Sequence, residues 1–195
     1  MPAITVPVPK IATDPGYLFH APLGTAEPTH TVVGSVFTDS WPSAWVALGG
    51  TEEGHSFSWA TSTETIEVAE FLDPIRYVET GRTGSVAFAL ASITLQNLNR
   101  ALNGGSVVST GTGATTLATY TPPALGASVR SMIGWESQDS TERLICFQVF
   151  NTGTVSIARR KGADKATLPI EFGIETPSSG VPFKYLTAGV ERLGV

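Results

Sequence analysis

The chain has 195 residues, which is enough for one domain with a substantial core or at most two small domains. Hydrophobic residues make up 42% of it and charged residues only 15%, below the roughly 25% of a typical soluble domain, so we expect much of its surface to be buried against partners. The net charge of −5 gives no basic excess, which argues against a surface that grips duplex nucleic acid.

The single cysteine, Cys146, excludes an internal disulfide framework and is typical of a reducing compartment. It lies in an apolar run, residues 144–147, so we expect it in the core. The first residues lack the basic and apolar regions of a signal peptide, and no stretch approaches the ~18 uninterrupted apolar residues of a membrane span. We therefore expect no membrane binding by this chain.

Six prolines stand in residues 1–29. Proline fixes φ and removes a hydrogen-bond donor, so this range is expected to be an extended N-terminal arm outside the core. Residues 30–195 are then expected to form a single domain.

Strand signals follow from residue 30 onward. Residues 30–37 are β-branched and apolar, which predicts a strand. Residues 44–48 and 55–60 are joined by the turn-forming segment 49–54, and this pattern predicts a hairpin.

The apolar positions change parity between Trp59 and Ile66. Such a change needs a bulge, a turn or a move to another sheet, and we place it at residues 61–63. Asp73-Pro74 and residues 79–81 predict two further breaks on either side of a short strand.

The only predicted helix lies near 93–103 and carries three leucines at i, i+3 and i+7: Leu95, Leu98 and Leu102. Ser92 or Thr94 can cap its start and Gly104 its end. We expect the leucines to pack against the small-residue face of the preceding strand, formed by Ala87, Ala89 and Ala91.

Beyond the helix, residues 109–127 indicate a loop or a short strand with long turns. A hairpin is predicted from 129–136 and 143–150, with strands at 154–158 and 167–174. Pro169 favours a sheet edge for the last of these. The predicted fold is mainly β, a β-sandwich or barrel of about nine strands with one flanking α-helix.

Catalytic motifs are missing from the sequence, and we expect no enzymatic activity, cofactor or metal. The glycines of residues 111–113 lack the third glycine and the lysine of a phosphate loop. His20 and His30 have no cysteine at metal-ligand spacing. His55 follows Glu52 and Glu53, which leaves a weak metal site open, although solvated turn residues explain them better.

Charged residues form two clusters along the sequence. The acidic stretch includes Glu64, Glu67, Glu70, Asp73 and Glu79, opposed by Arg76. The basic stretch holds Arg159, Arg160, Lys161 and Lys165. These are either solvated faces, or the acidic stretch of one copy meets the basic stretch of another, or the acidic stretch lines a cavity.

Three segments of the sequence resemble the major tail proteins of long-tailed bacteriophages, the subunits of the tail tube. They are VALGGTEEG at 46–54 leading to TIEV at 65–68, TLQNLNRAL at 94–102, and ARRKGADKATLPIEF at 158–172. Together they span roughly residues 44–175. The arm and the loop 105–127 lie outside the resemblance.

The resemblance implies a β-sandwich with a flanking helix that self-assembles into stacked hexameric rings. It also implies a virion location in the tail, assembly in the host cytoplasm, and transient passage of DNA through an acidic lumen during ejection. The implied partners are further copies of the chain and the tape measure, tail tip and terminator proteins. A long loop between early strands is implied to contact the next ring, which points to residues 61–82.

Two other classes of protein stay open. One is another virion or injection-machine component of similar fold, such as a decoration protein. The other is a small ligand-binding β-barrel walled by Trp45, Trp59 and Trp135, although core packing explains these tryptophans better.

Overall fold

The computed structural model describes residues 15–67, 69–70, 73–157, 159 and 166–189. Strands make up 49% of the chain and helix 6%, so the prediction of a mainly β fold with one α-helix is confirmed. The elements are, in chain order, β1 (Tyr17–Pro22), β2 (Val32–Val33), β3 (Val36–Phe37), β4 (Val46–Ala47), β5 (Thr51–Ile66), β6 (Arg76–Leu90), α1 (Leu95–Ala101), β7 (Ser106–Thr110), a 3₁₀ turn (Gly113–Thr115), β8 (Leu117–Thr121), β9 (Ser131–Glu136), β10 (Glu142–Asn151), β11 (Leu168–Ile174) and β12 (Phe183–Thr187).

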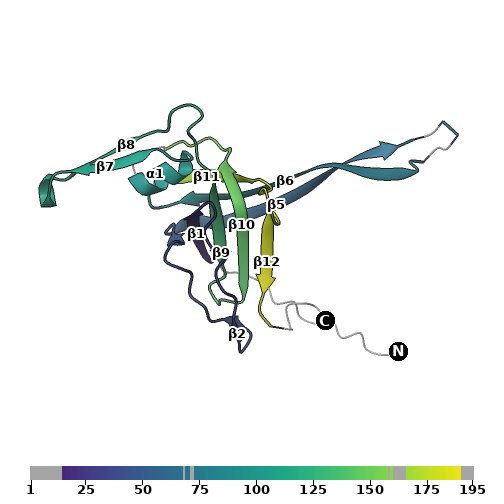
Figure 1. The fold of residues 1–195 in the computed structure, drawn as a ribbon, viewed down its shortest axis with the longest axis horizontal. Helices are drawn as coiled ribbons and strands as arrows, with labels where there is room; N and C mark the ends of the chain where they lie inside the picture. The colour runs from purple at the N-terminus through teal and green to yellow at the C-terminus, as the bar shows by residue number, and fades with distance from the viewer. Residues whose placement is uncertain (1–14, 68, 71–72, 158, 160–165, 190–195) are drawn as a thin grey trace.

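The body of the molecule is one antiparallel sheet with the strand order β4-β1-β9-β10-β11-β6-β5 (Figure 1). Strand β10 has two partners along its second edge, because β12 pairs with its first half and β11 with its last residues. The sheet curls back on itself: His55 on β5 and Trp135 on β9 have ring centroids 4.7 Å apart, although three strands lie between β5 and β9 in the sheet order. The curled sheet does not close into a barrel.

Apolar side chains on the concave side of the curl form the larger cluster, here called the inner core. Its buried members are Leu18, Leu48, Val86, Phe88, Leu90, Ala101, Ile133, Trp135, Leu144, Cys146, Val149, Leu168, Ile170 and Phe172. Burial raises the pKa of the Cys146 thiol to about 12, as the expected core position implies.

The opposite face of β1, β9 and β10 is also covered. Here Ala21, Trp45, Met132 and Ile145 form a second buried cluster, the outer core. The cover is the segment 23–45, from which Trp41 stacks on Phe19 with ring centroids 4.3 Å apart. The segment 23–45 must stay in contact with this face of the sheet for the outer core to remain buried.

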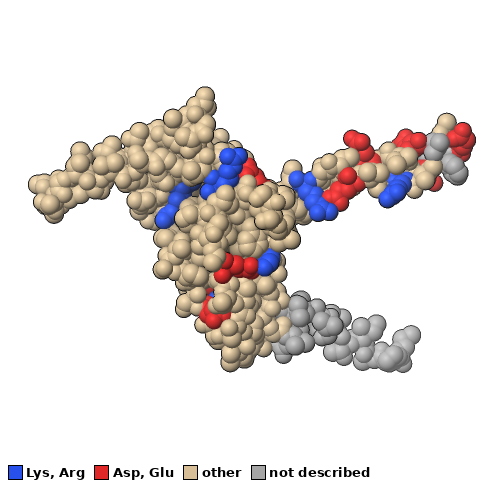
Figure 2. Space-filling model, in the orientation of Figure 1, with Lys and Arg blue, Asp and Glu red and all other residues tan. Residues whose placement is uncertain are grey.

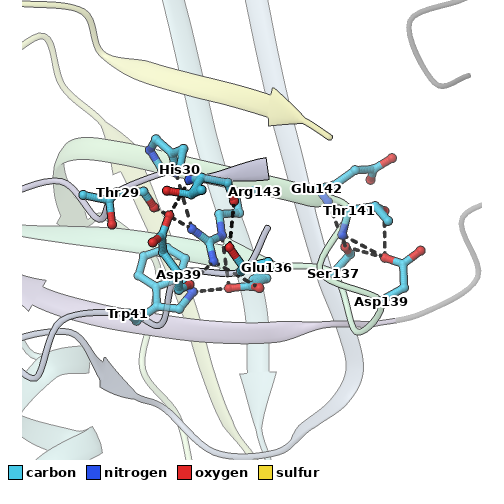
Figure 3. Close-up of polar contacts among 12 residues, drawn as sticks. Thr29, His30, Asp39, Trp41, Glu136, Ser137, Asp139, Thr141, Glu142 and Arg143 are labelled. Carbon is cyan, nitrogen blue, oxygen red and sulfur yellow. Dashed lines mark hydrogen bonds and ion pairs between the residues drawn. The ribbon is translucent and has the colours of Figure 1, made fainter. Parts of the chain in front are cut away.

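A buried arginine provides that hold (Figure 3). The side chain of Arg143 on β10 is 1% exposed, and its Nε lies 3.2 Å from Oε2 of Glu136 on β9. Its guanidinium donates to the backbone oxygens of Thr29, at 3.0 Å, and Asp39. The two strands are joined by a tight turn, and Arg143 and Glu136 are direct cross-strand neighbours.

Aromatic rings complete this network, which we call the Arg143 clamp. The guanidinium carbon lies 4.7 Å from the ring centre of Phe37 and 5.6 Å from that of Trp41. Trp41 also donates its Nε1 hydrogen to Glu136. The backbone N–H of Thr31 donates to Asp39, and this bond lowers the pKa of the Asp39 carboxyl. The clamp thus joins the hairpin β2–β3 and Trp41 to the central sheet.

The helix begins where the sequence predicts. Thr94 caps it by accepting a hydrogen bond from the backbone N–H of Asn97 at 3.1 Å. The buried residues of the helix are Asn97 and Ala101. Leu98 is half-buried against the inner core, and Leu95 and Leu102 are also half-buried.

The predicted contact between this helix and the alanine face is wrong. Alternation along β6 directs Val86, Phe88 and Leu90 into the inner core, where the helix packs. Ala87 and Ala89 therefore point to the other face of the sheet, and both are half-buried there.

Part of the expected N-terminal arm belongs to the sheet. Residues 17–22 form β1, which pairs with β9 along its whole length and buries Leu18 and Ala21. The number of prolines in residues 1–29 did not exclude a strand here, because Pro22 stands at the last position of β1, where a proline is tolerated. Residues 1–14 lie outside the described residues.

Other local predictions also change. Residues 46–47 pair with β1 instead of forming a hairpin with β5, and residues 30–37 form the two short strands β2 and β3 instead of one strand. Residues 79–81 contain the bulged residue Thr80 but do not end β6, and residues 154–157 are not a strand. Pro169 lies where β11 has β6 alone as neighbour, so this stretch is locally an edge.

We expect Arg143→Met to lower the free energy of unfolding by about 3–5 kcal/mol, because it leaves Glu136 buried without its counter-charge. The change is measured by urea denaturation followed by tryptophan fluorescence. Arg82→Met, which removes an exposed ion pair, is the matched control and should leave the stability nearly unchanged. A loss for Arg143→Met no larger than that of the control would contradict the role given to the clamp.

A second prediction concerns His20, whose pKa is lowered to about 4 by burial and by the positive charge of Arg100. The folded state binds this proton less readily than the unfolded state, whose histidine pKa is about 6.5. The free energy of unfolding should therefore fall as the pH decreases from 6.5 towards 4, by about 2 kcal/mol at pH 4.5. Urea denaturation of the wild-type chain and of His20→Gln at pH 7 and 4.5 measures it; equal pH dependence in both would refute the assignment.

Candidate assembly surfaces

The described residues hold no group of three or more His, Cys, Asp or Glu side chains placed to bind a metal ion. His55, which the sequence left open as a weak ligand beside Glu52 and Glu53, packs against Trp135. Within the described part of the chain, no helix is long and apolar enough to cross a membrane. The features that stand out are instead two hairpins that leave the body of the molecule.

The longer hairpin is formed by β5 and β6, and it extends far from the body (Figure 1). Its pairing runs from Thr51↔Leu90 to Ile66↔Arg76, with a register shift between Ser62 and Thr63. The shift lies opposite the predicted break at residues 61–63, but its extra residue is Thr80 on β6, within the predicted break at 79–81, and β5 itself continues without an extra residue. Beyond this bulge the described residues are exposed on both faces. We call this outer half, residues 63–79, the acidic arm.

The acidic arm carries charged and apolar side chains together. Figure 2 shows acidic residues gathered along it. Glu64 pairs across the hairpin with Val78, and Ile66 pairs with Arg76, so these four side chains share one face. Tyr77, on the other face, is 66% exposed. Exposed apolar side chains beside charges are typical of a contact surface that has no partner within the chain.

One acidic residue of this arm is neutralised within the chain. Arg82 donates through Nη2 to Glu79 Oε2 at 3.0 Å, and this hydrogen bond lowers the pKa of the Glu79 carboxyl. Glu79 is therefore less available to a partner than Glu64. Sequence analysis missed Arg82 as the partner, because residues three apart in a regular strand point to opposite faces. The extra residue Thr80 places Glu79 and Arg82 on the same face.

The structure describes some of the other charged residues predicted to form contacts, but not all of them. Glu67, Glu70 and Asp73 belong to the connection between β5 and β6 and are exposed. Arg159 is exposed after β10. Arg160, Lys161 and Lys165 lie outside the described residues, so a contact between the two charge clusters stays a prediction.

The shorter hairpin, β7 and β8, has the opposite character. No Asp, Glu, Lys or Arg stands between Arg100 and Arg130. Val107 and Tyr120 face each other across the strands and are half-buried, and the Tyr120 hydroxyl donates to the Gly104 oxygen at 2.8 Å. The other face is open, with Leu117 64% exposed. This hairpin projects on the side of the body away from the acidic arm (Figure 1).

Comparison with known proteins identifies the family. No curated protein sequence matches the chain. The sequence pattern of the phage tail tube proteins matches residues 11–187, which include β1, both hairpins and β12. This match covers most of the chain, so the chain belongs to the phage tail tube protein family, whose members are structural proteins of the virion tail.

Proposed function

We propose that copies of this chain stack as hexameric rings and form the tail tube through which DNA passes during ejection. Membership of the tail tube family supports self-assembly in a virion tail. The observation that carries the proposal is the acidic arm, which is exposed on both faces and extends well beyond the body. An element of this kind gains its buried surface from another copy.

The low charge content supports the same proposal. Charged residues are 15% of the chain, and the second hairpin has none, so large surfaces can be buried without stranding unpaired charges. The tape measure, tail tip and terminator proteins are the proposed further partners. Assembly in the host cytoplasm is proposed with them.

Two roles are proposed for the carboxylates of the acidic arm. They contact a second copy, or they face the lumen, where negative charge gives DNA phosphates nothing to hold. The first role has more support, because Glu64 shares a face with Ile66 and Val78. Apolar side chains on a lumen wall would lie in water. Arg159 and the neighbouring basic residues are one candidate partner for the arm.

Shortening the arm tests the proposal directly. Replacing residues 64–78 by an Asn-Gly turn between Thr63 and Glu79 removes a segment whose described side chains are all exposed, so the melting temperature should change by less than about 5 °C. Electron microscopy of the concentrated protein should show tubes for the wild-type chain and none for the shortened one. Cooperative loss of the fold would instead place the arm in the core, and tubes from the shortened chain would refute its role in stacking.

Charge reversal separates the two roles of the carboxylates. We expect the triple change Glu64→Lys, Glu67→Lys and Glu70→Lys to prevent tube formation, because it places like charges at the contact. The matched control changes the same residues to Asp and should still assemble. Tubes that form normally but pass DNA slowly would assign these residues to the lumen. If the residues contact a second copy, the assembly defect should weaken as salt is added. Normal tubes with normal DNA ejection would leave the arm a solvated face.

A further inference from the structure

The helix α1 lies on the side of the body away from the acidic arm (Figure 1). A hollow of about 560 Å³ opens beside its C-terminal end. Its walls come from β1 and the turn after it, from the end of the helix and from the strand entry at residues 129–131. Pro22, Leu23 and Val129 supply apolar wall, and His20, Arg100 and Arg130 supply polar groups.

Arg100 is the cation of this hollow that lacks a counter-charge. Its Nη1 donates to Oδ1 of Asn97 at 2.8 Å, and none of the described carboxylates forms an ion pair with it. Burial lowers its pKa, and its charge contributes to the lowered pKa of His20. Arg130 differs, because Glu175 accepts from it at 3.1 and 3.4 Å.

A half-buried cation without a counter-ion loses hydration, and the single hydrogen bond to Asn97 compensates for only part of that loss. A carboxylate placed in the hollow would restore the balance, and its aliphatic neighbours would cover the apolar wall. The hollow therefore fits a ligand that presents a carboxylate beside apolar side chains.

The acidic arm has that combination. Glu64 lies on one face with Ile66, Val78 and Arg76, and no described residue forms an ion pair with Glu64 or Glu67. Other carboxylates are already engaged, as Glu136 is with Arg143 and Glu175 with Arg130. Since the acidic arm extends away from the part of the body that holds α1 and β1, one chain cannot bring the arm to the hollow, whereas a head-to-tail pair of copies can.

We propose that the Arg100 hollow is the docking site for the acidic arm of a second copy, with Glu64 as the residue that reaches the guanidinium. This rests on the proposed function, in that it names the surface on which the arm of that assembly lands. Arg159 and its basic neighbours are then not the partner of Glu64.

Charge exchange tests the contact. Arg100→Glu should reduce the yield of tubes at least about tenfold while leaving the melting curve of the monomer close to wild type. Adding Glu64→Arg and Glu67→Arg to the same chain should restore assembly. Arg159→Glu, with the same change of net charge, is the matched control and should assemble. Tubes from Arg100→Glu, or a defect in Arg159→Glu that Glu64→Arg repairs, would overturn the proposal.

Cross-linking gives a readout that needs only pairs of copies. Asn99 lines the hollow, and a chain carrying Asn99→Cys and Glu64→Cys should form disulfide-linked ladders on mild oxidation. The single changes are the controls, and the buried Cys146 adds little background. Assembly without ladders would show that the arm lands elsewhere. If the wild-type chain forms no tubes, the proposed function fails, while ladders in concentrated solution would still support this contact and their absence would reject it.

Discussion

The buried ion pair between Arg143 and Glu136 is the contact on which the body of this protein depends. It lies on the outer face of the sheet, where it binds the backbone of segment 23–45 and supports Trp41. The outer core exists only while that segment is in place, because Trp45 is part of it and Trp41 packs against it. One sheet thereby gains two buried faces, and a chain of this size gains a rigid body from which hairpins can project.

Beyond the pairing of its two strands, each hairpin has few stabilising contacts within the described structure. An isolated two-stranded ribbon is marginally stable in water, and the outer half of β5–β6 has no third strand or covering helix in the described structure. The β7–β8 hairpin is anchored at its base by Tyr120 and Gly104 and is open beyond it. Their surfaces differ, since one combines charge with apolar residues and the other has no charge. Contacts of the two hairpins should therefore respond differently to salt.

The sequence predicted features that depend on neighbours along the chain. The cap at Thr94, the bulge near Ser62 and the hairpin of β9 and β10 are local patterns, and all three were found. Strand β1 was missed, and β4, which lies within the predicted strand 44–48, was given the wrong partner, because the true partners are far away in sequence. Arg143 and Glu136 flank a predicted turn as cross-strand neighbours, so their pairing was accessible from the sequence. The hollow at Arg100 was not, since distant segments meet there.

The placement of the two hairpins on opposite sides of the body has a consequence for any array of this chain. In a head-to-tail array, where the arm of each copy binds the hollow of the next as proposed above, successive copies all face the same way. Such an array is polar: one end displays arms without hollows, and the other displays hollows without arms. Growth at the two ends then proceeds through different chemistry, and a cap that fits one end does not fit the other.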